Sequence, residues 1–513
     1  MQVKILWADD EIDILKPHII FLEQKGYVVS TVNNGAEAVD LNKSENFDII
    51  FLDENMPGIS GLEALTRIKE DKPSIPVVMI TKSEEEHIME EAIGNKIADY
   101  LIKPVNPNQI LLTIKKNLDK SKLVSQTTNA NYQQEFRQLG MMLNSRMDAK
   151  EWMDLYQKLV YWELELENIE DAGMREILEM QKKEANTQFS RFIEDNYEDW
   201  IDGDEDAPIL LHQLFKERIA PIVKTEKVCL LVIDNLRFDQ WKILKPIIEK
   251  QFHVKREEII YSILPTATQY ARNAFFSGLM PQDIATKYSQ YWVDENEDGS
   301  KNKFEKELME TQLKRLGLDI KFNYNKITNY EAGKRFADSF HQYKDADLNA
   351  IVYNFVDMLS HARTESEMIR ELADDEAAYR SLTVSWFEHS PLQEIIRKVA
   401  ESKTKLIITT DHGTVKVRNP VKIVGERSTN TNLRYKVGRN LSYNAKEVFS
   451  TQPDHVRLPK SKMSAEYVFA RETDYFVYPN NYNHFVKYYQ NTFQHGGISL
   501  EEILIPYIEL DAK

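Results

Sequence analysis

Val3-Lys-Ile-Leu-Trp-Ala-Asp-Asp10 is a short apolar run that ends in two adjacent carboxylates. Apolar residues at helical spacing follow from Glu11 to Gln24, and this helical pattern ends at Gly26. Further short strand-like runs recur along the chain, with helical patterns between them: Tyr27–Val32, Ile49–Leu52, Val77–Ile80 and Tyr100–Ile102. This regular alternation predicts an α/β domain with a doubly wound parallel sheet of the (βα)5 type.

Polar side chains stand where these predicted strands end. They are Asp9, Asp10, Asp53, Thr81 and Lys103. Because the carboxyl ends of parallel strands share one edge of a sheet, we expect these groups to lie together. Three carboxylates suit Mg²⁺, which would neutralise a phosphoryl group moving onto Asp53, while Lys103 and Thr81 contact its oxygens. Each residue alone is typical of a solvated loop, but five in register with strand ends favour a site.

Three segments resemble the receiver domains of bacterial response regulators, over residues 1–118. They are Ile5-Leu-Trp-Ala-Asp-Asp-Glu11, Asp53-Glu-Asn-Met-Pro-Gly58 and Ala98-Asp-Tyr-Leu-Ile-Lys-Pro104. The resemblance implies that Asp53 is the phospho-acceptor and that Asn55 offers Mg²⁺ a backbone carbonyl beside Asp9, Asp10 and Asp53. It also implies that Thr81 and Tyr100 form a switch pair. Lys82 departs from the family, which usually has a small residue there, and Lys103-Pro104 is a candidate cis peptide.

Residues 119–207 form a different kind of segment. The composition is polar from Ser121 to Asn131, and apolar residues then recur at helical spacing from Tyr132 to Tyr197 almost without glycine or proline. This pattern predicts a three-helix linker bundle. An acidic stretch, Asp202-Gly-Asp-Glu-Asp-Ala-Pro208, marks its end, and strand-helix alternation returns in residues 208–513.

A second polar constellation follows three predicted strands of this last region, Val228–Ile233, Ala350–Phe355 and Leu406–Thr409. Its members are Asp234, Asp357, His361, Asp411, His412 and, before a Gly-Gly turn, His495. Asp357 and His361 are four residues apart, so a helix would put both on one face. Mixed carboxylate and imidazole ligands suit Zn²⁺ or Mn²⁺, and six of them indicate two adjacent ions that could clamp a phosphoryl transfer.

A nucleophile candidate lies in Pro265-Thr-Ala-Thr268, because a threonine hydroxyl becomes reactive when a metal lowers its pKa. Of Thr266 and Thr268 we prefer Thr268. His253, His341 and His389 are interpreted as ordinary surface or core residues.

Residues 208–513 resemble the alkaline phosphatase superfamily, closest to its PglZ branch. The resemblance rests on Val232-Ile-Asp-Asn-Leu-Arg-Phe-Asp239, Pro265-Thr-Ala-Thr268 with Ser277-Gly-Leu-Met-Pro281, Asp357-Met-Leu-Ser-His361, Asp411-His-Gly413 and His495-Gly-Gly497. It implies one zinc held by Asp357, His361 and His495. It implies a second zinc held by Asp234, Asp411 and His412, with Thr268 as its nucleophilic ligand. Gln269 to Ala271 depart from the branch's usual residues.

The whole chain resembles the PorX-type response regulators of type IX protein secretion in Bacteroidetes. The resemblance implies a zinc phosphodiesterase acting on oligonucleotides or cyclic nucleotides. It also implies a sensor histidine kinase, a sigma factor or secretion component as partners, and a homodimer in the activated state. The alternative is a catalytically silent module whose zinc shapes a surface for a transcription or secretion partner.

Length, composition and net charge limit the number of domains, the cellular compartment and the type of output domain. A length of 513 residues predicts two or three domains, and one cysteine, Cys229, excludes a disulfide framework. No signal peptide and no apolar run of roughly 20 residues is visible, so we expect a cytoplasmic protein without membrane insertion. A net charge of −17 and the lack of a helix-turn-helix pattern disfavour a DNA-binding output.

One local stretch runs against this acidic balance. Between residues 416 and 439, seven cations accompany the single acid Glu426: Lys416, Arg418, Lys422, Arg427, Arg434, Lys436 and Arg439. They would steer a polyanionic substrate to the metals, and a solvated loop explains them equally well.

Overall fold

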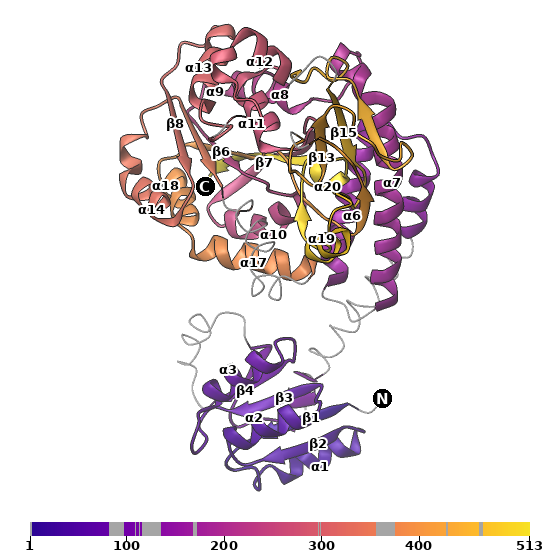
Figure 1. The fold of residues 1–513 in the computed structure, drawn as a ribbon. Helices are drawn as coiled ribbons and strands as arrows, with labels where there is room; N and C mark the ends of the chain where they lie inside the picture. Colours follow the sequence, from indigo (N-terminus) through magenta and orange to yellow (C-terminus); the bar gives the residue numbers. More distant parts are fainter. Residues whose placement is uncertain are drawn as a thin grey trace. The chain divides into compact units, whose positions relative to one another are not determined.

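The computed structural model describes residues 3–81, 97–107, 109–111, 113–114, 135–167, 172–295, 297, 299–354, 356, 375–426, 429–460 and 465–513. The chain divides into two compact units, Met1–Gln134 and Glu135–Lys513. Figure 1 draws the fold of each unit.

The first unit is built on a parallel five-stranded sheet of order β2-β1-β3-β4-β5. Its strands are β1 Lys4–Ala8, β2 Val28–Val32, β3 Ile49–Asp53, β4 Val77–Thr81 and β5 Asp99–Ile102. Its labelled helices are α1 Lys16–Gln24, α2 Gly35–Ser44 and α3 Gly61–Asp71. This strand order is the doubly wound one, so the predicted fold class is confirmed.

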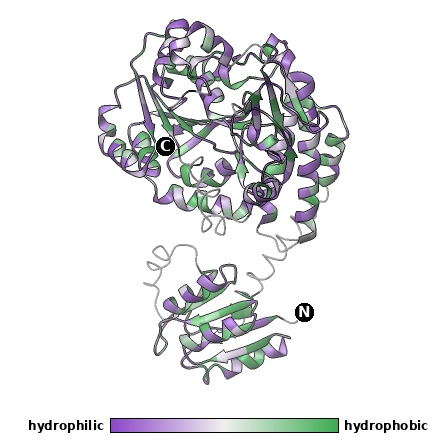
Figure 2. Cartoon of the chain, in the orientation of Figure 1, coloured by the Kyte–Doolittle hydropathy of each residue, from purple (hydrophilic) through white to green (hydrophobic). Residues whose placement is uncertain are grey.

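Both faces of this sheet are buried. Alternate residues of β1 point to opposite sides, so Leu6 and Ala8 join one apolar cluster while Ile5 and Trp7 join another. Strands buried on both faces are continuously hydrophobic, and Figure 2 shows them as green bands within each unit. This pattern explains why the sequence alone locates the strands.

The second unit contains a six-stranded sheet of order β7-β18-β10-β6-β9-β8. Its strands are β6 Val228–Ile233, β7 Phe252–Tyr261, β8 Phe322–Ile327, β9 Leu348–Tyr353, β10 Lys405–Thr409 and β18 Leu504–Ala512. The four strands β10, β6, β9 and β8 are parallel, and β18 runs antiparallel between β10 and β7. The fold is therefore α/β, as predicted.

The sequence locates the central parallel strands β6, β9 and β10, but it missed the antiparallel strand β18 and both edge strands. β6 has the predicted bounds, and β9 and β10 begin one or two residues before them. The edge strands β7 and β8 were missed because both are partly polar, with Lys255-Arg-Glu-Glu258 inside β7 and Asn323-Tyr-Asn325 inside β8. An edge strand exposes one side to water, so it lacks the continuous apolar run of a central strand.

Helices cover both faces of this sheet. Their bounds are α8 Leu211–Leu214, α9 Ala220–Val223, α10 Phe238–Ile248, α11 Thr268–Ser277, α12 Pro281–Lys287, α13 Glu305–Arg315, α14 Tyr330–Ser339, α17 Glu376–His389, α18 Pro391–Glu401, α19 Tyr482–Tyr489 and α20 Leu500–Ile503. Figure 1 shows α10 and α17 on one side of the sheet, with α8, α11 and α13 on the other. The parallel strands β6 and β10 are neighbours, so their carboxyl ends lie at the same edge of the sheet.

Three small sheets lie between β10 and β18 in the sequence. They consist of β11 Val415–Lys416 with β17 Phe493–Gln494, β12 Asn419–Lys422 with β16 Asp474–Val477, and β13 Tyr435–Gly438, β15 Glu466–Ala470 and β14 Val448–Thr451. The β11–β17 pair ties the segment after His412 to the segment before His495. This pairing positions two predicted ligands that are far apart in the sequence.

The helical segment after the first unit belongs to the second unit. It contains a helix over residues 135–143, α6 Ala149–Glu167 and α7 Ala172–Asp202. The Asn186 side chain of α7 donates to Glu501 and accepts from the Leu500 N–H, and the Tyr197 hydroxyl accepts from the Leu264 N–H. Three helices are present as predicted, but they pack on the output sheet and its loops instead of forming a separate body.

Among the described helices, none combines the length and hydropathy that a bilayer crossing requires.

Candidate functional site

The acidic cluster of the first unit lies at the end of β1 and β3. Oxygens of Asp9, Asp10 and Asp53 lie within 4.8 Å of one another. Asp9 and Asp53 are buried, and Asp10 is exposed. The pKa of Asp53 is raised, because burial and the neighbouring acids Asp9 and Asp10 outweigh the hydrogen bond from Lys103, which lowers it. Concentrated negative charge in a partly buried pocket is a setting in which a divalent cation is stabilised.

Lys103 reaches this cluster from the end of β5. Its Nζ lies 2.7 Å from Asp53 Oδ1 and 3.0 Å from Asp9 Oδ2. Although burial opposes a charge on Lys103, its bonds to Asp53 and Asp9 raise its pKa. The Lys103–Pro104 peptide is cis. The structure thus brings together four of the residues that strand-end spacing singles out.

The remaining receiver residues are placed in part. Asn55 is exposed in the turn after β3. Thr81 ends β4 and pairs with Ile102 through the backbone, and Tyr100 is the second residue of β5. The side chains of Thr81 and Tyr100 lie outside the described residues, as does Lys82.

Gly61 was not singled out from the sequence, yet the acceptor loop needs it. A Cβ at this position would lie 2.2 Å from the Asp53 carbonyl oxygen. α3 therefore begins directly against the loop that carries Asp53, and only glycine permits this approach.

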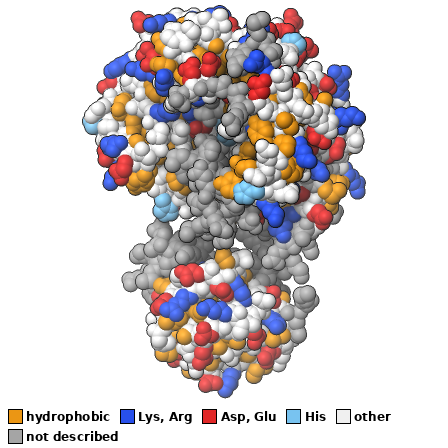
Figure 3. All heavy atoms as spheres, in the orientation of Figure 1, with side chains coloured by type: hydrophobic (Ala, Val, Ile, Leu, Met, Phe, Trp, Pro, Cys, Tyr) orange, Lys and Arg blue, Asp and Glu red, His pale blue; other side chains and the backbone are white. Residues whose placement is uncertain are grey.

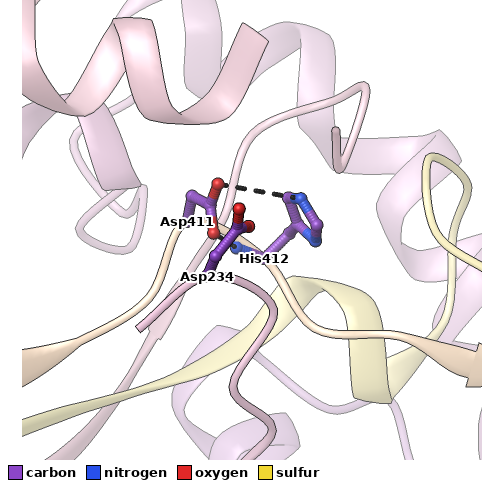
Figure 4. A group of neighbouring side chains, drawn as sticks. All are labelled: Asp234, Asp411 and His412. Carbon is purple, nitrogen blue, oxygen red and sulfur yellow. Dashed lines mark hydrogen bonds and ion pairs between the residues drawn. The ribbon is translucent and has the colours of Figure 1, made fainter. Parts of the chain in front are cut away.

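The second cluster lies at the ends of the parallel strands β6 and β10. Ligand atoms of Asp234, Asp411 and His412 lie within 4.8 Å of one another, and all three residues are buried. Figure 4 shows their side chains facing one another across the two loops. Because β6 and β10 are paired in parallel, Asp234 and Asp411 come to the same sheet edge although 177 positions separate them.

Thr268 is the first residue of α11 and faces this cluster. Its Oγ1 lies 3.1 Å from His412 Nε2. The other candidate, Thr266, is buried and donates its hydroxyl to the Gly497 carbonyl at 2.9 Å, while accepting from the Gly496 N–H. Thr266 therefore holds the Gly-Gly turn, and Thr268 is the hydroxyl beside the acid-imidazole cluster.

His495 extends the cluster on the side of His412. The two imidazole rings are stacked with centroids 4.2 Å apart, and His495 Nδ1 lies 3.1 Å from the Thr266 carbonyl oxygen. The turn needs its glycines, since Gly496 has φ 123° and a Cβ on Gly497 would lie 2.4 Å from the Ala470 carbonyl oxygen. The predicted partners of His495, Asp357 and His361, lie outside the described residues.

Arg272 is a member of this site that the sequence reasoning missed. It is buried on α11, one turn after Thr268, with Nη1 2.7 Å from Asp234 Oδ2 and 3.8 Å from Asp411 Oδ2. Glu305 holds its Nε at 2.6 Å. The i, i+4 spacing from Thr268 was the one available signal, because it puts both side chains on one helix face.

The donor set fits a metal ion. Asp411 Oδ2 is buried and accepts no hydrogen bond, although the Arg272 guanidinium lies nearby. Burying a carboxylate oxygen without such a bond is costly, and a cation removes that cost. Two carboxylates, one imidazole and a hydroxyl match the ligands of Zn²⁺ or Mn²⁺.

The cationic stretch of residues 416–439 is only partly available to a substrate, which corrects the expectation for two of its members. Arg434 is buried against Glu502 at 2.6 Å, and Lys436 is buried with its Nζ donating to the Asn430 carbonyl. Lys422 is exposed, and Arg418 is exposed but paired with Glu179. Sequence spacing does not distinguish a buried cation from a solvated one.

Lys436 gives the second unit a pH-dependent stability. Burial lowers the pKa of Lys436 from 10.5 to about 7. The unfolded chain therefore binds more protons between these values, and stability rises with pH across this window, by up to about 1.4 kcal/mol per pH unit. Urea unfolding at pH 7 to 10 is expected to show this rise in the wild type and its loss in Lys436→Met. The exposed Lys446→Met is the matched control, and parallel stability curves for wild type and Lys436→Met would contradict the prediction.

Three family models match successive parts of the chain. Residues 214–510 match the family model of the BREX system PglZ alkaline phosphatase-like domain. Residues 122–201 match the PorX response regulator linker domain, and residues 5–115 match the response regulator receiver domain.

Two curated relatives each match about a quarter of the chain. The transcriptional regulatory protein ResD of Bacillus subtilis is 35% identical over 132 residues, which are 25% of this chain and 53% of ResD. The alginate biosynthesis regulator AlgB of Pseudomonas syringae is 36% identical over 122 residues, 24% of this chain and 27% of AlgB. The chain thus spans about half of one relative and about a quarter of the other.

A solved receiver domain from Methanospirillum hungatei is 29% identical to this chain. The match covers 24% of this chain and 98% of the solved chain, with a TM-score of 0.22.

The PglZ match extends over more than half of the 513 residues. The chain therefore belongs to the PglZ family of alkaline phosphatase-like domains, which it joins to a response regulator receiver and a linker in a PorX-type architecture.

Proposed function

We propose that the chain is a response regulator phosphorylated on Asp53 whose PglZ domain is a zinc-dependent phosphodiesterase. Its substrates are oligonucleotides or cyclic nucleotides, and Thr268 is the nucleophile. The observation that carries the enzymatic part is the Thr268 hydroxyl 3.1 Å from His412 Nε2, beside the buried Asp234 and Asp411. A site that only bound a partner would need no hydroxyl at this position.

Zinc would be held by Asp234, Asp411 and His412, with Thr268 beside them. By resemblance to the family, a second ion would be held by Asp357, His361 and His495. Bound zinc lowers the pKa of a nearby hydroxyl and neutralises charge on phosphoryl oxygens.

The chain's own groups prepare Thr268 for attack. His412 Nδ1 lies 3.0 Å from the Gly413 carbonyl oxygen, so Nδ1 carries the proton and Nε2, beside Thr268, offers its lone pair to the zinc that would bind both. Thr268 also begins α11, where the positive end of the helix dipole stabilises a negatively charged oxygen. Arg272 balances the charge of Asp234 and orients it.

Phosphorylation would take place at the receiver cluster, with a sensor histidine kinase as the donor. Asp9, Asp10, Asp53 and the Asn55 carbonyl would hold Mg²⁺, and Lys103 would contact a phosphoryl oxygen after releasing Asp53. Phosphorylated Asp53 would act through Thr81 and Tyr100 to change dimerisation or access to the output domain. We further propose that this controls type IX protein secretion through a sigma factor or a secretion component.

Asp53→Asn is expected to abolish covalent phosphorylation, because the amide cannot accept a phosphoryl group. The measurement is intact mass after incubation with acetyl phosphate and Mg²⁺. Asp40→Asn, an exposed acid on α2, is the control and should gain one phosphoryl group as the wild type does. A phosphoryl group on Asp53→Asn would show that another residue is the acceptor.

One observation favours a second candidate, a catalytically silent module whose zinc shapes a surface for a transcription or secretion partner. The Arg272 guanidinium lies 2.7 Å from Asp234 Oδ2, so the chain itself already balances part of the acidic charge. A cluster stabilised in this way keeps its shape without turnover.

Metal content and hydrolysis of bis(p-nitrophenyl) phosphate distinguish the two candidates. We expect zinc to co-purify with the chain, a strong chelator to abolish hydrolysis, and added zinc to restore it. Asp411→Asn should lose zinc, whereas Asp345→Asn, an exposed acid, should retain it. Zinc without hydrolysis would favour the binding module, and a chain that holds no metal would overturn both candidates.

A further inference from the structure

Two segments beside the proposed zinc site contain cations but no acidic residue of their own. Residues 412–425 and 475–500 contain no aspartate or glutamate, although the whole chain has a net charge of −17. They contain the cations Lys416, Arg418, Lys422 and Lys487. The two segments lie side by side, since β11 pairs with β17 and the Val417 N–H donates to the Thr492 carbonyl. Lys416 and Arg418 line one cavity together with Glu176, Glu179, Glu376, Glu472 and Glu501, so Lys422 and Lys487 are the cations that distinguish this surface.

Helix α19 adds aromatic rings to the same surface. Its inner side, with Phe485 and Tyr489, packs on an apolar cluster that includes Val415 and Tyr475. No residue of α19 is fully buried, and His484, Lys487 and Tyr488 are exposed. Figure 3 shows hydrophobic side chains gathered on the surface where Figure 1 places α19.

The exposed rings form an ordered pair. His484 and Tyr488 are one helical turn apart, and their rings are stacked with centroids 6.3 Å apart. Lys422 Nζ lies 4.9 Å from the Tyr482 ring centroid at the edge of the same surface. Arg418 is paired with Glu179 and is not included in this set. We name His484, Lys487, Tyr488, Lys422 and Tyr482 the α19 face.

The α19 face is connected to the proposed zinc site through β17. After α19 the chain returns to β11, where Phe493 pairs with Lys416, and it reaches His495 two residues later. His495 lies seven positions after Tyr488, and seven residues of extended chain span at most about 25 Å. A ligand on the α19 face is thus within about 25 Å of His495, a span that an oligonucleotide of about ten units can cover.

We propose that the α19 face is a subsite for a single-stranded oligonucleotide, in which Tyr488 and His484 stack on bases while Lys422 and Lys487 contact phosphates. This inference rests on the proposed function and names the part of the chain that distinguishes an oligonucleotide from a small phosphodiester. Aromatic rings accept any base, and cations spaced among them follow the backbone. An apolar partner would not need the two lysines that accompany the exposed rings of the α19 face.

The test is binding of fluorescein-labelled decathymidylate, measured by anisotropy in a Thr268→Ala chain so that the probe stays intact. Tyr488→Leu is expected to raise Kd about tenfold, and the effect should vanish with an abasic probe of equal length. Lys422→Gln with Lys487→Gln should weaken binding of both probes and flatten the salt dependence. Tyr330→Leu, an exposed tyrosine on α14, is the matched control and should leave Kd unchanged.

Several outcomes separate this inference from the proposed function. If Tyr488→Leu and the double lysine variant both bind decathymidylate like their parent chain, the α19 face is not a subsite, whatever the enzyme does. A parent chain that does not bind the probe overturns the inference as well. Binding that depends on the α19 face in a chain whose Thr268 form hydrolyses no diester would sustain the subsite and overturn the proposed phosphodiesterase.

Discussion

Thr268→Ala is expected to lower kcat for bis(p-nitrophenyl) phosphate by about a thousandfold or more, because it removes the attacking oxygen. Thr268 Oγ1 is 3.1 Å from His412 Nε2, whereas the hydroxyl of the other candidate, Thr266, donates to the Gly497 carbonyl. The fold should persist, since this residue is only partly buried at the start of α11. The measurement is steady-state hydrolysis, together with zinc content.

Two further variants make this prediction specific. Thr268→Ser retains a hydroxyl and should retain a substantial part of kcat, whereas a merely structural threonine would not require one. Thr286→Ala, on the exposed surface of α12, should leave kcat unchanged. Full activity in Thr268→Ala with zinc bound would show that the nucleophile is another group.

Arg434→Met is expected to destabilise the second unit by roughly 3–5 kcal/mol, because it leaves a buried carboxylate without its cation. Arg434 and Glu502 are both fully buried, with Nη2–Oε2 at 2.6 Å and Nε–Oε1 at 3.2 Å. Glu502 also accepts from the Gly497 N–H at 2.9 Å. The ion pair therefore holds the turn that carries His495, and its loss should also lower zinc content.

Urea unfolding followed by tryptophan fluorescence measures this effect, because six of the seven tryptophans lie in the second unit. Adding Glu502→Gln to Arg434→Met should recover part of the lost stability, since the unpaired charge disappears. Arg439→Met, a partly exposed cation of the same stretch, is expected to change the free energy of unfolding by less than about 0.5 kcal/mol. An equal effect of Arg434→Met and Arg439→Met would contradict the role of burial.

The sequence by itself determined the receiver sheet and the main strands of the output sheet. Central parallel strands are buried on both faces, so their positions are written locally as continuous apolar runs. Their ends are equally local, and parallel pairing then carries Asp9, Asp53 and Lys103, or Asp234 and Asp411, to one sheet edge. These residues could be identified because polar residues at the carboxyl ends of parallel strands meet at one sheet edge, and finding them requires only the position of each strand end.

Only the tertiary structure decided which polar groups are buried and what they contact. Arg272 beside Asp234 and Arg434 beside Glu502 look in the sequence like ordinary helix and loop cations. The packing of α6 and α7 on the output domain could not be predicted either. Amphipathic spacing shows that one face of a helix is buried, but it does not show which element covers that face. Burial and ion pairing depend on contacts between elements that are distant in the chain, and a local sequence pattern does not show which distant elements will meet.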